Sequence, residues 1–175
     1  MSEIFVVPLR YNYKTNDTTM SEVELYLIGE GENCTLYTLQ FLRDDNNEFE
    51  KFVAKFINDS DYSEDYTRIA AIVSRIARTG ALERYFRREG RESDSVVALP
   101  VMSSKLRLYC LRLSDKILIL GNGDVKNTRT YEEDSKLKAY VLTLQKFEKL
   151  LKQGVEDGSV TITESTIETD NIFEL

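Results

Sequence analysis

The stretch KLRLYCLRLSDKILILGNGDVKNTRTYEED, residues 105–134, contains two apolar runs on either side of a short Ser-Asp-Lys turn. The second run, residues 117–120, is apolar throughout, which predicts a central strand covered on both faces. The short turn predicts an antiparallel hairpin of strands 106–113 and 116–121. The Gly-Asn-Gly that follows predicts a sharp turn that ends the second strand, so that a basic segment leaves the sheet at its rim.

Apolar residues outside this stretch show strand and helix patterns. Aromatic and β-branched runs predict further strands at 4–10, 22–28, 34–43 and 95–102. Apolar residues recur at helical spacing in three segments, which predicts helices at 47–58, 63–79 and 132–153. Asp45 followed by Glu48 resembles the start of the first helix, and Gly80 and Gly154 are expected to end the second and third.

The order of these elements predicts the fold class. SVTITES, residues 159–165, resembles a final strand, and an acidic tail follows it. Runs of strands with the helices grouped together are typical of an α+β fold with a largely antiparallel sheet. We therefore expect one domain over residues 1–175, in which the sheet packs against the two N-terminal-side helices. An extra N-terminal β meander and a long C-terminal helix complete it.

Composition excludes several kinds of site. Histidine is absent from the 175 residues, so histidine triads and histidine zinc sites are excluded. The common glycine-rich nucleotide motifs are also absent, and we expect no cofactor and no metal. Cys34 and Cys110 are expected to be small buried hydrophobes. Without an apolar run of about 18 residues or a signal-peptide pattern at the N-terminus, we expect a cytoplasmic protein with no membrane partner.

Charge is distributed unevenly along the chain. The net charge is -7, yet residues 75–129 contain 12 Lys or Arg and 6 Asp or Glu, a net charge of +6 against -13 for the rest. A local excess of this kind is typical of a site for a polyanion. Solvated helix and strand faces that are basic without a ligand are the alternative.

Three stretches of the chain resemble the RelE/ParE superfamily of bacterial toxins, and within it the phage-derived and HigB-like toxin families. They are YTLQFLRDDNNEFEKFVAKF at residues 37–56, YTRIAAIVSRIARTGALERYF at 66–86 and VVALPVMSSKLRLYCLRLSDKILILGNGDVK at 96–126. The resemblance covers residues 35–131 as a RelE-like core. It leaves residues 1–34 as an N-terminal β extension and residues 132–175 as a C-terminal helix, strand and acidic tail.

This resemblance implies the toxin of a type II toxin-antitoxin system, a metal-independent endoribonuclease that cuts mRNA, often on the ribosome. A cognate helix-turn-helix antitoxin would hold it inactive. Arg, Lys and Tyr would replace histidine in such chemistry, because Arg and Lys stabilise phosphate charge without titrating near neutral pH. The implied catalytic residues are Lys126, Arg129, Tyr131, Arg107 and Arg112, and the implied RNA-binding residues are Arg84, Arg87, Arg88 and Arg91.

Departures from the family pattern leave other functions open. Gly-Asn-Gly stands where many relatives have His-Gly-Phe, and Asp124 places an acid inside the basic segment. Arg107 as an outward-facing strand residue and Tyr131 as the packed start of a helix are the structural alternatives. A RelE-fold interaction protein without catalysis, binding an antitoxin or another protein, is the second functional hypothesis. A globular domain with no link to RNA is the third. Catalysis requires the predicted residues to converge in one concave patch.

Overall fold

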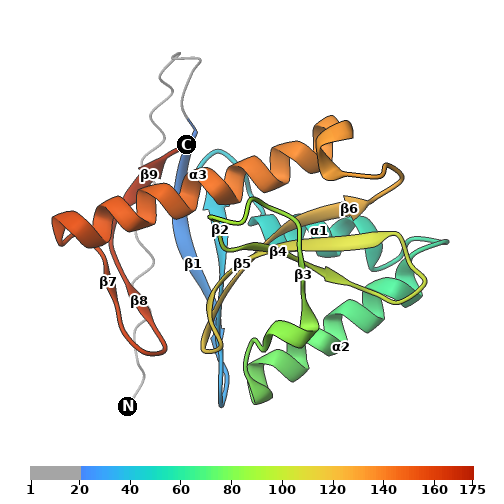
Figure 1. The fold of residues 1–175 in the computed structure, drawn as a ribbon, viewed down its shortest axis with the longest axis horizontal. Coiled ribbons are helices and arrows are strands. Elements are labelled where there is room, and N and C mark those ends of the chain that lie inside the picture. Colours follow the sequence, from blue (N-terminus) through green and yellow to red (C-terminus); the bar gives the residue numbers. More distant parts are fainter. Residues whose placement is uncertain (1–20) are drawn as a thin grey trace.

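The computed structural model describes residues 21–175, and the strand expected at 4–10 lies outside that range (Figure 1). Its strands are β1 (Glu22–Glu30), β2 (Thr35–Phe41), β3 (Arg87–Arg88), β4 (Val96–Pro100), β5 (Leu106–Ser114), β6 (Ile117–Val125), β7 (Thr161–Ile162), β8 (Ile167–Glu168) and β9 (Ile172–Glu174). Its helices are α1 (Glu48–Phe56), α2 (Ser63–Thr79) and α3 (Ser135–Asp157), with short 3-10 turns η1 (Glu83–Tyr85) and η2 (Tyr131–Glu133).

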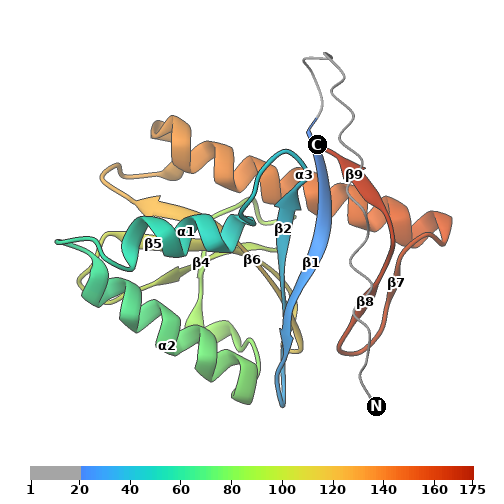
Figure 2. The same ribbon diagram turned by 180° about the vertical axis from the view of Figure 1, so that it is seen from behind.

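Seven of the strands form one mixed sheet in the order β3-β4-β5-β6-β2-β1-β9, and β7 and β8 form a separate hairpin. Only β2 and β6 are parallel among the described pairs. Helices α1 and α2 lie on one face of the sheet and α3 crosses the other (Figures 1 and 2). The expected α+β fold with a largely antiparallel sheet is therefore confirmed.

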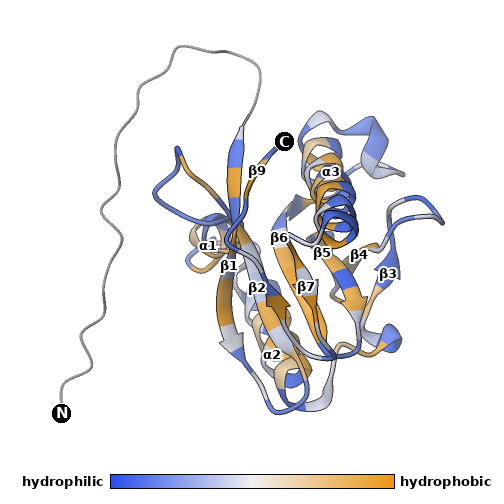
Figure 3. Cartoon of the chain, turned by 90° about the vertical axis from the view of Figure 1, so that its left-hand side faces the viewer, coloured by the Kyte–Doolittle hydropathy of each residue, from blue (hydrophilic) through white to orange (hydrophobic). Residues whose placement is uncertain are grey.

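The β5–β6 hairpin forms the middle of the sheet, as its sequence predicts. Residues 117–120 of β6 are at most 1% exposed and lie between β5 and β2. Ile117 and Ile119 pack in the core under α3, and Leu118 and Leu120 pack in the core under α1 and α2. The same apolar strands lie between α3 and α2 in Figure 3. Cys34 and Cys110 are both buried free thiols, as expected.

Helix α2 has the predicted bounds, but other helix ends differ from the prediction. Gly80 ends α2 with φ 98°, a conformation that favours glycine. The capping box of α1 is formed by Asn47 and Glu50, because the Asn47 side chain accepts from the Glu50 backbone and the Glu50 carboxylate accepts from Asn47. The prediction that Asp45 and Glu48 start this helix was therefore wrong by two residues.

The C-terminal third of the chain differs more. Helix α3 continues through Gly154 and ends at Gly158, which has φ 82° in the left-handed region. A Cβ at Gly154 would lie 2.4 Å from Val160 Cγ2, so this glycine lets the chain return against the helix. The predicted final strand contains only β7. Part of the expected acidic tail is β9, which pairs with β1 and buries Phe173 in the core.

The Gly-Asn-Gly segment is not a turn, contrary to the prediction. Strand β6 runs through it to Val125, and neither Gly121 nor Gly123 has a positive φ. A Cβ at Gly123 would lie 1.9 Å from the Arg107 carbonyl oxygen of β5. These glycines therefore permit close approach of two strands, and the basic segment leaves the sheet only after residue 125. Of the helices described, none combines the length and apolarity needed to cross a membrane.

Candidate anion-binding groove

An open groove with a volume of about 690 Å³ runs between α2, the η1–β3 segment and the end of β4. Its lining contains four arginines, two aromatic residues and several apolar side chains, and no Asp or Glu. These residues are Arg68, Ala71, Ile72, Arg75, Arg84, Tyr85, Phe86, Arg87, Pro100, Val101 and Met102. The groove therefore combines a positive wall with apolar surface.

Helix α2 supplies two of the arginines because of its amphipathic spacing. Ile69, Val73 and Ile76 form the buried stripe of the helix. Arg68 and Arg75 lie seven residues apart, about two turns, so both project from one face beside that stripe. The apolar stripe thus fixes the helix on the sheet and presents the two guanidinium groups along the groove.

The η1–β3 segment supplies the other two arginines and is tied to the end of α2. The Tyr85 hydroxyl lies 3.1 Å from Thr79 Oγ1, and the Arg84 guanidinium lies 5.4 Å from the centre of the Tyr85 ring. The Thr79 hydrogen bond, followed by Arg84, lowers the pKa of the Tyr85 hydroxyl. Arg87 follows in β3, which pairs with β4.

Most of this positive charge is not neutralised. Arg68 lies 3.4 Å from Asp65 in an exposed pair one turn away. Among residues 21–175, no carboxylate lies within ion-pairing distance of Arg75, Arg84 or Arg87. Exposed guanidinium groups without a carboxylate partner can bind phosphate oxygens at a low desolvation cost.

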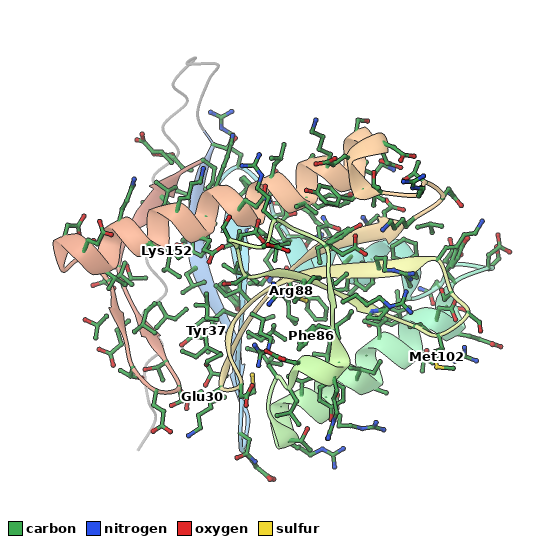
Figure 4. The ribbon with its side chains drawn as sticks, in the orientation of Figure 1. Glu30, Tyr37, Phe86, Arg88, Met102 and Lys152 are labelled. Atoms are coloured by element: carbon green, nitrogen blue, oxygen red, sulfur yellow. The ribbon has the colours of Figure 1, made fainter. Side chains whose placement is uncertain are left out.

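Apolar and aromatic side chains complete the groove. Phe86 and Met102 lie at separate points along the side of α2 (Figure 4). Met102 is 85% exposed, an unusual exposure for an apolar side chain. Proteins that bind single-stranded nucleic acids combine aromatic faces with arginines, because the bases stack on the rings while the phosphates bind the cations.

The structure brings together only two of the predicted RNA-binding arginines. Arg84 and Arg87 both line the groove. Arg88 is exposed on the edge strand β3, outside the groove lining (Figure 4). Arg91 is exposed in the turn after β3, where its backbone N–H donates to Asp94.

The predicted catalytic residues do not converge in one patch. Arg107 and Arg112 are five residues apart on β5, so their side chains lie on opposite faces of the sheet. Arg112 Nε donates to the Ala81 carbonyl oxygen at 2.6 Å, and its guanidinium pairs with Asp115. Arg112 therefore ties the end of α2 to the β5–β6 turn. Arg129 is exposed after β6.

A second group lies under α3 and contains the other predicted residues. Lys126 Nζ lies 3.0 Å from a Glu89 carboxylate oxygen. Burial, and after it the Arg87 charge, lowers the pKa of Arg107, which Glu89 opposes. Burial, and then Glu89, raises the pKa of Tyr109. We call Glu89, Arg107, Tyr109 and Lys126 the Glu89 cluster. Tyr131 packs against the core beside it, as the structural alternative predicts.

A third polar group connects α1, β6 and α3. Lys55 Nζ donates to Asn122 Oδ1 at 2.9 Å and to the Tyr140 hydroxyl at 3.1 Å, and lies 3.5 Å from Asp124. Burial lowers the pKa of Lys55, and burial raises that of Tyr140 to about 12. These contacts join the two helical layers through the sheet, which is a structural role. In the described part of the chain, no three acidic or thiol side chains are grouped as metal ligands.

Comparison with known proteins gives no counterpart. No protein-family model and no curated protein matches the sequence, and no solved structure matches the fold. The resemblance to RelE/ParE toxins and the residue roles that it implies therefore stay predictions.

Sequence reasoning missed Arg68, Arg75, Glu89 and Tyr109 as members of these sites. Arg68 and Arg75 had a detectable signal, because they lie seven residues apart and off the apolar stripe of α2. Glu89 and Tyr109 had none, since their proximity to Lys126 and Arg107 depends on how β3, β5 and the segment after β6 meet in space.

Proposed function

We propose that the protein binds single-stranded RNA through the arginine groove. The observation that carries the proposal is the lining itself, in which four arginines and two aromatic residues meet without an acidic side chain. Phosphate contacts supply most of the affinity of sequence-independent nucleic-acid binding, and stacking adds roughly 1–3 kcal/mol per base. A groove of about 690 Å³ is large enough for a short segment rather than a duplex.

The resemblance to RelE/ParE toxins supports RNA as the polyanion, and a toxin component of a toxin-antitoxin system is the narrower form of this proposal. The resemblance rests on the order strand, helix, helix, three strands; residues 35–125 contain β2, α1, α2 and then β4, β5 and β6, with the two-residue strand β3 in addition before β4. Binding is better supported than cleavage. Arg112 lies away from Arg107, and the Lys126 charge is neutralised by Glu89.

A binding assay with a cleavage arm tests this proposal. A fluorescently labelled 12-nucleotide RNA of mixed sequence is titrated with the full chain by anisotropy, and the same samples are run on a denaturing gel. We expect salt-sensitive binding and intact RNA. Shortened RNA that disappears with Arg107→Lys would establish the ribonuclease form instead. Absence of binding at about 50 mM salt, where phosphate contacts are strongest, would refute the proposal.

An exposed sheet edge favours the interaction protein as a second candidate. Ser21 exchanges both backbone hydrogen bonds with Leu175, and β1 pairs with β9 only as far as Glu24. In an antiparallel strand every second residue directs its backbone N–H and C=O to the same neighbour, so Leu25 and Leu27 direct theirs to the same side as Ser21. Beyond Glu24 this edge of β1 is unpaired among residues 21–175. Unpaired edges of this kind accept a strand from a partner.

Hydrogen exchange distinguishes this candidate from the groove. The chain is coexpressed with the product of an adjacent open reading frame, where an antitoxin would be encoded. Protection of the Leu25 and Leu27 amides in the resulting complex would support strand addition. A stable complex that protects only α2 and the η1–β3 segment would refute it and place the partner in the groove.

A further inference from the structure

The Glu89 cluster contains an ion pair that is largely removed from solvent. Lys126 Nζ lies 3.2 and 3.0 Å from the two Glu89 carboxylate oxygens. The Lys126 side chain is 15% exposed and that of Glu89 is 10% exposed. Both oxygens of the carboxylate are thus directed to a single ammonium group.

Two further donors in the cluster are buried without an acceptor. Arg107 Nη1 donates to the carbonyl oxygens of Ser104 and Leu106, both at 2.8 Å, but Arg107 Nε has no partner among the described residues. The hydroxyl of Tyr109 also has none in that range, although Tyr109 is 0% exposed. Arg107 and Tyr109 are two residues apart on β5 and therefore share the α3 face of the sheet.

Buried donors without acceptors are rare in folded proteins, and each calls for an explanation. Here Lys126 alone contacts the Glu89 carboxylate, while the Glu89 charge also acts on the pKa of Arg107 and of Tyr109 without a hydrogen bond to either. A carboxylate has two oxygens in one plane, and Lys126 contacts both of them. A phosphate presents oxygens in three dimensions and can accept from several donors at once.

We propose that Lys126, Arg107 and Tyr109 form a phosphate-binding site and that Glu89 occupies it in this structure as a built-in anion. The segment that carries Glu89 is suited to release it. It follows the two-residue strand β3, and the next backbone bond to β4, from Gly90 N–H to the Val96 carbonyl, is long at 3.4 Å. This site goes beyond the proposed RNA groove, because none of its four side chains lines that groove.

Glu89→Gln tests the proposal because it removes the charge of the occupant and keeps its shape. Binding of inorganic phosphate is measured by calorimetry at constant ionic strength, with sodium chloride replacing phosphate in the controls. We expect Glu89→Gln to bind phosphate at least tenfold more tightly than the wild type. The gain should disappear when Tyr109→Phe is added. The matched control is Glu83→Gln, which removes an exposed acid outside the cluster and should leave phosphate affinity unchanged.

A second measurement keeps the proposal testable if Glu89→Gln does not fold. Phosphate should raise the melting temperature of the wild type above that in chloride of equal ionic strength, and Tyr109→Phe should abolish the difference. Equal shifts in the two proteins would overturn the proposal. So would a phosphate gain that survives Tyr109→Phe, or a Tyr109→Phe protein that is less stable without any phosphate effect. The last result indicates a buried water as the partner of the hydroxyl.

The probe separates this inference from the proposed function. Inorganic phosphate reports on the cluster through Glu89 and Tyr109, and neither residue lines the RNA groove. Failure of the phosphate experiment therefore leaves the RNA-binding proposal intact. Loss of RNA binding on substitution of the groove arginines leaves the phosphate site intact.

Discussion

Removing two groove arginines should weaken RNA binding and lower its salt dependence together. The change is Arg75→Gln with Arg84→Gln, one side chain from each wall of the groove. A charged hydrogen bond contributes about 1.5–3 kcal/mol when well formed, and roughly half of that is expected in an open groove. Loss of two contacts should therefore reduce affinity by roughly 10- to 100-fold at fixed salt, since about 1.4 kcal/mol corresponds to tenfold.

Salt dependence gives a second magnitude from the same structure. For single strands the slope of log affinity against log salt is about -0.7 per phosphate neutralised. Four arginines predict a slope of about -2.8, and the two that remain predict about -1.4. Between 50 and 200 mM salt, wild-type affinity should fall by about 50-fold and that of the variant by about sevenfold.

The matched control removes the same charge elsewhere. Arg43→Gln with Lys149→Gln replaces two exposed cations that do not line the groove. Exposed substitutions of this kind should each change stability by about 0.5 kcal/mol or less, so melting temperatures verify that all three proteins are folded. Anisotropy titrations with the labelled 12-nucleotide RNA give both quantities. Equal losses in the groove variant and the control would show that RNA senses only net charge, which would refute the groove.

Three further predictions concern the fold. Leu118→Ala should destabilise the protein by about 2–5 kcal/mol in urea unfolding, because Leu118 is fully buried in the central strand; a loss below about 1 kcal/mol would contradict that packing. Gly123→Ala should lower the free energy of unfolding by at least about 1–3 kcal/mol, since its Cβ would overlap the β5 backbone. Gly29→Ala is the control, because no atom lies within 4 Å of the added Cβ, and it should leave the melting temperature almost unchanged. Equal effects of the two substitutions would refute the close approach of β5 and β6 at Gly123. Burial lowers the pKa of Lys55 in the folded protein below the ordinary 10.5. Between the lowered pKa and about 10.5 the unfolded chain binds more protons than the folded one, so stability should rise with pH up to about 10.5. Lys55→Met should remove this rise in urea unfolding between pH 8 and 10.5, and an unchanged dependence of stability on pH would argue against a lowered pKa.

Local sequence patterns predicted those elements that are fixed by residues close together in the chain. The apolar run at 117–120 required a strand covered on both faces, and the structure places it in the centre of the sheet. Helix α2 has the predicted bounds because its apolar spacing and Gly80 agree on where it ends. In both cases a short window of sequence contains all the information that fixes the element.

Glycines misled the sequence reasoning because a glycine has more than one use. Gly123 and Gly154 were both interpreted as points where an element ends. Each lies inside its element, where the missing Cβ admits a second segment of chain, namely β5 for Gly123 and the segment around Val160 for Gly154. Which segment approaches is a property of the tertiary fold, so the residue type alone does not reveal it.

The predicted site failed to converge for a related reason. Residues 75–129 were identified as a basic segment by counting charges along the chain, but ion pairing in space decides which of these charges are available to a ligand. Lys126, Arg112 and Lys116 pair with Glu89, Asp115 and Glu164, and the last of these acids lies outside the basic segment. Three of the four groove arginines have no carboxylate partner in the described part of the chain, and the fourth, Arg68, forms an exposed pair with Asp65. Two of the four come from helix α2.

A polyanion approaching this groove also meets a protein whose net charge is -7. At about 0.15 M salt the screening length is about 8 Å, so acids elsewhere on the molecule contribute little to a ligand held among the arginines. Near 0.01 M it grows to about 30 Å, and the acidic remainder of the chain then repels RNA. The wild-type slope should therefore flatten at low salt, below the value that four phosphate contacts predict. The acids are the same in the wild type and the double variant, so their repulsion affects both slopes equally and leaves the difference of about 1.4 between the slopes unchanged. That difference, rather than either slope alone, tests whether arginines in the groove bind the phosphates.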